Sequence, residues 1–207
     1  MRGQPPAQPL LPGYEAFHRY WVNARGKYGV KLKLGECYVT RNDEVIMTTL
    51  GSCISVCMRD PAVGIGGMNH FILPASADSH ANSPITEATR YGTFAMEELV
   101  NGILRFGGRR ERLEAKVTGG GRVIASGGGV GAANIEFIQE YMDAENLPVL
   151  AWDVGGDDPR QVIYLPREGR MLVKRMGGVN VEQLAQEETS YRSRIERTLQ
   201  SSDVELF

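Results

Sequence analysis

The stretch that decides the fold runs from residue 50 to residue 74 and reads LGSCISVCMRDPAVGIGGMNHFILP. Residues 45–58 and 64–73 are rich in β-branched and apolar side chains, which is typical of strands. Between them, Arg59-Asp-Pro-Ala62 is a turn signal, because proline fixes φ and aspartate caps turns. The pattern predicts an antiparallel hairpin, with a break near Gly51 where the first run divides into two strands.

The hairpin brings a cysteine and a histidine together. If the chain turns at Pro61-Ala62, Asp60 faces Val63 and Cys53 faces His70, with Cβ atoms roughly 4.5–5.5 Å apart. A thiol with a free pKa of about 8.5 needs such a base to become a nucleophile. A bulge at Gly66-Gly67 would instead turn the two side chains to opposite faces.

The remaining elements set the fold class. Strands are expected at 37–40, 113–117, 148–152, 161–165 and 171–175, and helices at 84–106 and 132–146. This order is not a simple βαβ alternation, so we expect an α/β (α+β) layered sandwich with a mixed β-sheet and two main helices. Residues 1–30 are interpreted as a partly disordered extension with a short helix over 14–28, residues 31–178 as the catalytic domain, and 179–207 as a polar tail, either a loosely attached helix or disorder.

Composition narrows the function classes. The 207 residues carry 23 basic and 25 acidic side chains, so nothing favours nucleic acid or an anionic membrane as a partner. No apolar run is long enough for a signal-peptide core or a membrane span, which favours the cytoplasm and reduced thiols. Three cysteines and three histidines without a CxxC spacing make a zinc site improbable, and no cofactor is expected.

The residues around Cys53 fit nucleophilic catalysis. Gly51 and Ser52 let a substrate approach the backbone, and backbone N–H groups there, such as that of Cys53, are suited to hold an oxyanion. Thr48, Thr49 and Asn69 are each close enough in sequence to orient the base, and the residues do not choose among them.

Structural interpretations compete with these. Free cysteines commonly pack in cores, which is our interpretation of Cys37 and Cys57 and an equal alternative for Cys53. A lone histidine such as His70 is more often a hydrogen-bonded core residue than a base. The glycine triplets at 119–121 and 127–129 match no phosphate-loop pattern and are interpreted as turns, with a substrate-channel wall as the alternative.

Successive blocks of the chain resemble the CheD family in their order. They cover residues 31–178 and are Leu50-Gly-Ser-Cys53, the Asp60 turn, Gly66-Gly-Met-Asn-His70-Phe-Ile-Leu-Pro74, Glu114-Ala-Lys-Val-Thr-Gly-Gly-Gly121, Gly131-Ala-Ala-Asn134 and Asp153-Val-Gly-Gly156. The Leu-Gly-Ser-Cys block followed by Gly-Gly-Met-Asn-His-Phe at this spacing is the most specific part.

The resemblance implies a protein-glutamine deamidase that converts glutamines of methyl-accepting chemoreceptor helices to glutamates and releases ammonia. It maps the catalytic pair onto Cys53 and His70, through a cysteine thioester, and implies a fold like that of the cytotoxic necrotizing factor deamidases. It also implies binding to the phosphatase CheC in some members. A helical substrate favours a shallow groove over a deep pocket.

Two positions depart from the family pattern. Some members have a catalytic threonine six residues before the cysteine, where this chain has Met47, so Thr48 is favoured over Thr49 for that role. The block that often reads Gly-x-Arg-Asn lacks its arginine here. Two other functions therefore stay open: a non-catalytic adaptor that binds receptor or phosphatase, and a cysteine hydrolase that acts on receptor methyl esters.

Overall fold

A computed structural model describes residues 4–74, 87–123, 129–177 and 181–201. Residues 84–86 of the first expected helix lie outside these ranges, as do residues 127 and 128 of the second glycine triplet. The strands are β1 (Arg19–Val22), β2 (Lys27–Lys31), β3 (Cys37–Thr40), β4 (Val45–Leu50), β5 (Ile54–Asp60), β6 (Ile65–Asn69), β7 (Glu114–Gly119), β8 (Val149–Val154), β9 (Arg160–Leu165) and β10 (Arg170–Arg175). The helices are α1 (Glu87–Arg105), α2 (Val130–Ala144), α3 (Val181–Ser201) and the 3₁₀ turn η1 (Arg110–Arg112).

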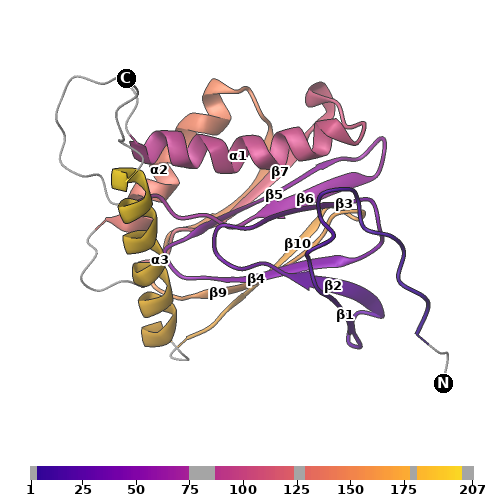
Figure 1. Ribbon diagram of the computed structural model, residues 1–207, viewed down its shortest axis with the longest axis horizontal. Coiled ribbons are helices and arrows are strands. Elements are labelled where there is room, and N and C mark those ends of the chain that lie inside the picture. Colours follow the sequence, from indigo (N-terminus) through magenta and orange to yellow (C-terminus); the bar gives the residue numbers. More distant parts are fainter. Residues whose placement is uncertain (1–3, 75–86, 124–128, 178–180, 202–207) are drawn as a thin grey trace.

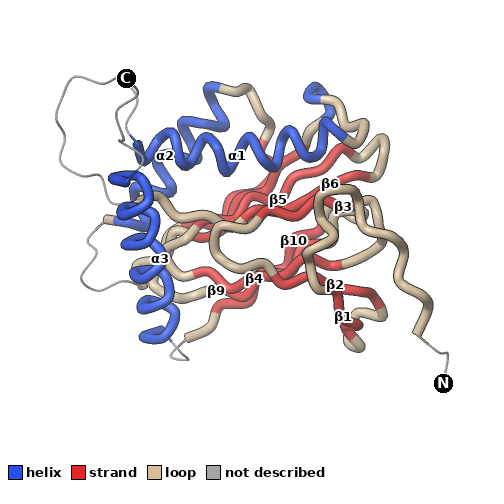
Figure 2. The backbone as a smooth tube through the Cα atoms, viewed as in Figure 1, coloured by secondary structure: helices blue, strands red, loops and turns tan. Residues whose placement is uncertain are grey.

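The strands form two five-stranded sheets packed face to face (Figure 1). Sheet A has the order β1-β2-β4-β9-β10, and sheet B has the order β3-β6-β5-β7-β8. Each is mixed, because β2–β4 and β7–β8 are parallel pairs and the other pairs are antiparallel. Helices α1 and α2 cover the outer face of sheet B, and α3 runs across one end of the sandwich (Figure 2).

Two apolar cores hold these layers together. One lies between sheet B and the two helices and contains, among others, Ile54, Val56, Phe71, Leu99 and Ile138. The other lies between the sheets and contains Val30, Leu32, Tyr38, Ile46, Leu50, Cys53, Cys57, Met68, Ile72, Val162 and Tyr164. Strand β5 contributes alternate side chains to both cores, as expected for a strand buried on both faces.

The mixed α and β class expected from the sequence is confirmed, but three details differ. The structure has two mixed sheets instead of one, and α3 adds a third helix. Residues 14–28 contain no helix, because β1 and β2 form a hairpin in which Trp21 pairs with Tyr28. Their rings pack edge to face with centroids 5.2 Å apart, and this cross-strand aromatic contact favours the hairpin.

The pairing register of the β5–β6 hairpin is shifted by two residues from the predicted one. Asp60 pairs with Ile65, so the loop has four residues, and the isolated bridge between Ile54 and Phe71 continues the same register. The predicted direct pairing of Cys53 with His70 is therefore wrong. Asp60 and Gly64 fix the longer loop, because the Asp60 carboxylate accepts from the Ala62 N–H and Gly64, at a φ of 63°, donates its N–H to the Asp60 carbonyl.

A shift of two residues preserves the side-chain face. Cys53 and His70 therefore lie on the same face of the β5–β6 pair, as diagonal and not direct neighbours. Diagonal pairs are about 7–8 Å apart at the backbone and within reach of long or aromatic side chains. Both face the core between the sheets.

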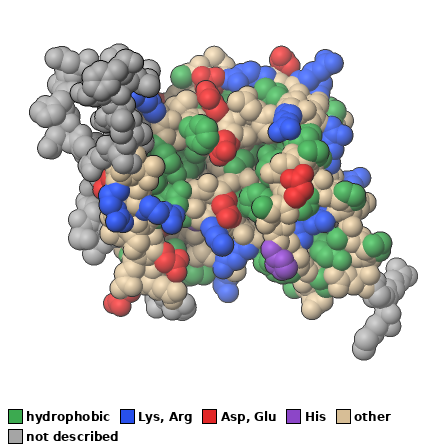
Figure 3. All heavy atoms as spheres, viewed as in Figure 1, with side chains coloured by type: hydrophobic (Ala, Val, Ile, Leu, Met, Phe, Trp, Pro, Cys, Tyr) green, Lys and Arg blue, Asp and Glu red, His purple; other side chains and the backbone are tan. Residues whose placement is uncertain are grey.

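The distribution of surface charge and the apolar character of the helices are relevant to which partners the protein can bind. The face in Figure 3 carries acidic and basic side chains interspersed, without one continuous basic stripe. Among the described helices, none has the length and apolar character needed to cross a membrane.

Candidate active site

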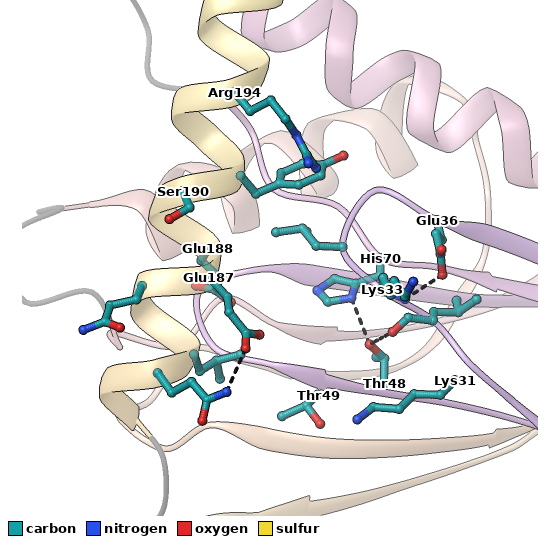
Figure 4. A pocket seen from close by; sticks show the side chains of 16 residues that line it. Lys31, Lys33, Glu36, Thr48, Thr49, His70, Glu187, Glu188, Ser190 and Arg194 are labelled. Carbon is teal, nitrogen blue, oxygen red and sulfur yellow. Dashed lines mark hydrogen bonds between the residues drawn. The ribbon is translucent and has the colours of Figure 1, made fainter.

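His70 and Thr48 meet between the two sheets at the end that α3 covers (Figure 4). His70 follows β6 directly, and its backbone is fixed by hydrogen bonds of its N–H to Glu36 and of its carbonyl to Gly35. Thr48 lies in β4 of the opposite sheet, with its hydroxyl 2.8 Å from Nδ1 of His70. Its hydroxyl also lies 3.0 Å from the Leu32 carbonyl.

These contacts assign the tautomer of His70. The Leu32 carbonyl can only accept, so the Thr48 hydroxyl proton is donated to it. The same hydroxyl oxygen must then accept from His70, which places the ring proton on Nδ1. Nε2 is left with a lone pair, and it is buried without a hydrogen-bond partner among the described residues. This is the protonation state that a general base requires.

His70 is held neutral by its surroundings. Burial lowers its pKa to about 3, since an imidazolium would lose its hydration there. A hydrogen bond involving the Leu32 backbone opposes this effect but is smaller. Near neutral pH the ring therefore remains available as a proton acceptor.

Cys53 is the buried thiol on the same face as His70. It immediately precedes β5, and none of it is exposed. Burial raises the pKa of the Cys53 thiol well above its usual range, and the neighbouring Glu188 carboxylate raises it further by charge and by a hydrogen bond. Cys53 is thus held as a thiol in this conformation.

The loop before Cys53 is tied down through its carbonyl groups. The Gly51 carbonyl accepts from the Gly121 N–H and the Cys53 carbonyl from the Gly120 N–H, both at 2.8 Å. Between them, Asn134 of α2 donates its side-chain amide to the Ser52 carbonyl at 2.8 Å. The first glycine triplet therefore holds the nucleophile loop, a role that the sequence analysis had not considered.

With the carbonyls bound on one side, the N–H groups of the loop converge on the other and form an anion-binding concavity. The Glu188 carboxylate of α3 fills it. It accepts from the N–H groups of Gly51 at 2.9 Å, Ser52 at 3.0 Å and Cys53 at 3.4 Å, and from the Ser52 hydroxyl. We call these three N–H groups the amide nest. A Cβ at position 51 would lie 2.8 Å from a carboxylate oxygen, so this approach requires glycine.

A cavity of about 800 Å³ adjoins the nest, with His70 on one wall and α3 forming the other (Figure 4). The body contributes Lys31, Leu32, Lys33, Leu34, Glu36, Thr48 and Thr49, and α3 contributes Gln183, Leu184, Gln186, Glu187, Glu188, Ser190, Tyr191 and Arg194. The site is therefore a cavity enclosed by the chain's own helix, whereas the sequence favoured a shallow groove.

Most of the predicted site residues lie in this region. Gly51, Ser52 and Cys53 form the amide nest, and Thr48 contacts His70. Thr48 faces inward because it alternates with Ile46 and Leu50 of the inter-sheet core. Met47 and Thr49 lie on the opposite side of β4, where Thr49 still borders the cavity.

Asn69 does not belong to the site. Its side chain points toward α1, where Oδ1 accepts from the Val56 N–H at 2.9 Å and Nδ2 donates to the Ala95 carbonyl at 3.0 Å. Since Asn69 and His70 are consecutive in an extended chain, they point to opposite faces. The predicted contact of Asn69 with substrate is therefore replaced by a structural role.

Sequence reasoning missed two residues at the site. Glu188 lies in the tail that was interpreted as loosely attached, yet its side chain is buried and bound at the nest. Asn134 was noted only as part of a family block. The arginine absent from that block would stand at Ala133, which is exposed on α2 and directed away from the buried Asn134. A one-dimensional pattern gives no signal for either contact.

Within the described ranges, no group of three or more His, Cys, Asp or Glu side chains is arranged to hold a metal ion.

Comparisons with known proteins agree on one family. Residues 72–175 match the family model described as CheD chemotactic sensory transduction. A protein of Saccharophagus degradans named probable chemoreceptor glutamine deamidase CheD is 44% identical over 205 residues, which cover 97% of this chain and 94% of the relative. Proteins with the same name from Hahella chejuensis (42% identical, 99% and 96% covered) and Hydrogenovibrio crunogenus (45%, 89% and 96%) are similar in extent.

Proposed function

Because the chain belongs to the CheD family, we propose that it is a chemoreceptor glutamine deamidase with Cys53 as nucleophile and His70 as general base. Its relatives carry that activity in their names and match nearly the whole chain. The reaction hydrolyses a glutamine side-chain amide of a chemoreceptor to glutamate and releases ammonia, in the service of chemotaxis.

The observation that carries the proposed residue roles is the carboxylate of Glu188 in the amide nest beside Cys53. A site that binds an anionic oxygen through backbone N–H groups next to a thiol is suited to stabilise the oxyanion of a tetrahedral intermediate. Removing one such donor typically costs about 10²–10³-fold in rate. The same nest would hold the glutamate product.

The proposed reaction proceeds in two stages. His70 takes the proton of Cys53 at Nε2, and the thiolate attacks Cδ of the glutamine while the nest stabilises the oxyanion. Protonated His70 then gives its proton to the leaving nitrogen, so that ammonia departs and a thioester remains. Water, deprotonated by His70, hydrolyses the thioester and returns the Cys53 thiol. Thr48 keeps the ring oriented throughout, through its contact at Nδ1.

Three finer points belong to the same proposal. The substrate glutamines lie on helices of methyl-accepting receptors, and a CheC-type phosphatase is a second partner that competes with them. The fold is related to that of the cytotoxic necrotizing factor deamidases, for which the two-layer sheet core with a Cys–His pair gives support. The protein acts in the cytoplasm, where its three unpaired cysteines stay reduced.

The test is to incubate the protein, and separately its Cys53→Ala variant, with the cytoplasmic part of a chemoreceptor from the same organism. Peptide mass spectrometry then maps each glutamine. Conversion to glutamate by the native protein only supports the deamidase and the role of Cys53. Receptor that is bound but unchanged would favour an adaptor, and release of methanol instead of ammonia would favour a methyl esterase.

A further inference from the structure

Helix α3 is attached to the body in an unusual way. Along residues 181–198, only Glu188 and Ile195 are buried, and the other side chains are partly or fully exposed. Surface helices normally dock through an apolar stripe, and glutamate is almost never buried without partners. Here the most buried side chain of the helix is a carboxylate that is 2% exposed. The helix is therefore held mainly by what binds Glu188.

What binds Glu188 is the amide nest at the nucleophile. The carboxylate accepts from the N–H groups of all three nest residues, and its charge raises the pKa of the Cys53 thiol beside it. A glutamate side chain in this place has the chemistry of the product that the proposed reaction forms. Its carboxylate oxygens bind the N–H groups that the proposed mechanism assigns to the oxyanion of a reacting glutamine.

The other contacts of α3 place it across the entrance. The Tyr191 hydroxyl lies 2.9 Å from that of Tyr91 on α1, and Arg192 donates to the Leu73 carbonyl at 3.2 Å. Position 35 is a glycine whose missing Cβ leaves room for the Tyr191 hydroxyl, since a Cβ there would lie 1.8 Å from it. Tyr191 also packs against the core between the sheets, but few side chains of α3 are buried, which suits a segment that binds reversibly.

With α3 in place, the site is in a resting state. Cys53 is fully buried, and one wall of the cavity beside His70 is formed by residues of α3. Burial, together with the charge of Glu188, raises the pKa of the thiol, so the thiolate is disfavoured. A receptor helix could neither reach the sulfur nor place its amide in the nest while Glu188 occupies it.

We propose that α3 is a built-in inhibitor that occupies the substrate-helix site as a product mimic, with Glu188 in the place of the reacting side chain, and that substrate must displace it. This inference rests on the proposed deamidase function and adds a regulatory element to the same site. It also predicts that the protein deamidates its own residue 188 when that residue is a glutamine.

The first experiment uses the full-length Glu188→Gln variant, which is nearly isosteric. Cys53 should attack Cδ of the introduced glutamine, with its thiol proton passing to His70. The C–N bond then breaks and ammonia leaves, and water cleaves the thioester to give glutamate and the free thiol. Mass spectrometry of the purified variant should find glutamate at position 188. The Cys53→Ala/Glu188→Gln double variant and the Glu187→Gln variant should keep their introduced glutamines, because the first lacks the nucleophile and Glu187 is exposed outside the nest.

The outcomes separate the two proposals when the same Glu188→Gln protein is also given receptor. If the glutamine introduced at position 188 persists while receptor glutamines are converted, the deamidase stands and the product-mimic inference is overturned. If the introduced glutamine and the receptor glutamines both persist, the proposed function fails and takes the inference with it. Conversion at position 188 that depends on Cys53 supports both.

The second experiment measures inhibition directly. Alkylation of Cys53 by iodoacetamide, followed peptide by peptide, should be on the order of tenfold faster or more in Glu188→Ala than in the native protein, since the charge-assisted contacts that hold α3 are lost. Glu187→Ala should match the native rate, and buried Cys57 should stay unreactive in every variant as an internal control for folding. Equal Cys53 rates in native and Glu188→Ala protein would overturn the inhibitory role.

Discussion

The hydroxyl of Thr48 lies 2.8 Å from Nδ1 of His70, across the interface between the two sheets. Because the same hydroxyl gives its proton to the Leu32 carbonyl, this contact selects the tautomer of His70 with a free lone pair at Nε2. Thr48 comes five residues before Cys53, and its place opposite His70 follows from how sheet A packs on sheet B.

Replacement of Thr48 by valine should reduce kcat by roughly 10²-fold, at the lower end of what general acid–base catalysis contributes. Valine has a similar shape but no hydroxyl, so it removes the side-chain acceptor at Nδ1 and weakens the constraint on the orientation and tautomer of the ring. Thr48→Ser should retain most of the activity. Receptor deamidation assayed by ammonia release measures both, and equal activity in native and valine variants would remove Thr48 from the site.

Introducing threonine at Met47 should neither raise activity nor rescue Thr48→Val. Met47 faces the outer side of sheet A, with its terminal methyl group close to Gly29 of β2, and cannot approach His70 without a change of strand register. The measurement compares the Thr48→Val and Met47→Thr/Thr48→Val variants in the same assay. Recovery in the double variant would mean that β4 can shift by one residue.

Asn134 should act as a positioning residue for the nucleophile loop. It donates to the Ser52 carbonyl and accepts from the Leu73 N–H, both at 2.8 Å. Asn134→Asp keeps the bond from the Leu73 N–H but loses the bond to the Ser52 carbonyl. We therefore expect kcat to fall about tenfold or more while KM changes little. This decrease in kcat is smaller than the ~10²–10³-fold decrease caused by losing an oxyanion donor. Ala133→Arg, which adds a side chain at the exposed neighbouring position, is the matched control and should leave kcat unchanged.

Replacement of Asn69 should lower the stability of the protein without lowering its kcat. Asn69→Ala leaves the buried Val56 N–H and Ala95 carbonyl without this partner, at a cost of roughly 1–3 kcal/mol in the free energy of unfolding. At temperatures where the variant is folded, its kcat should match that of the native protein. Urea unfolding and the deamidation assay together test this, and a large loss of kcat in folded protein would restore Asn69 to the site.

Much of the fold could be predicted from the sequence, because most of its strands and helices correspond to local sequence patterns. Runs rich in β-branched and apolar residues predict β3 to β10, and the i, i+4 spacing of Tyr91, Ala95, Leu99 and Ile103 predicts α1. The hairpin register is not predicted, because the loop length depends on the side-chain contact of Asp60 with the Ala62 N–H and on the left-handed φ of Gly64. The β1–β2 hairpin is not predicted either, because the mixture of aromatic and charged residues over 14–28 also suits a short helix, and the pairing of Trp21 with Tyr28 appears only once two strands meet.

The part of the site that depends on local sequence could also be predicted, and the part that depends on tertiary packing could not. Gly51 and Ser52 could be predicted from one hairpin, as could the location of Cys53 and His70 on one face of it. A two-residue shift in register leaves every side chain on the same face of the sheet. The contact of Thr48 depends on packing between sheets, and that of Glu188 on a helix 135 residues from Cys53. Because α3 is polar, its composition resembles that of a solvated tail, and only the amide nest explains why one of its acids is buried.

The neutral state of His70 should be visible in the pH dependence of stability. Burial lowers its folded-state pKa to about 3, whereas an unfolded histidine titrates near 6.5. Between these values the unfolded chain binds one more proton than the folded chain, so stability is complete above about pH 6.5 and is lost as the pH falls. At pH 5 this loss reaches about 2 kcal/mol, the product of about 1.5 pH units and about 1.36 kcal/mol per unit.

The measurement is the difference in urea-unfolding free energy between pH 7 and pH 5, which stays above the range where most carboxylates titrate. His70→Asn, whose amide can still donate to Thr48, should lose less stability over this interval than the native protein. His18→Asn, which alters an exposed histidine, is the matched control variant. If His70→Asn and the native protein lose the same amount, the folded-state pKa of His70 is not lowered, and burial does not hold the ring neutral at pH 5.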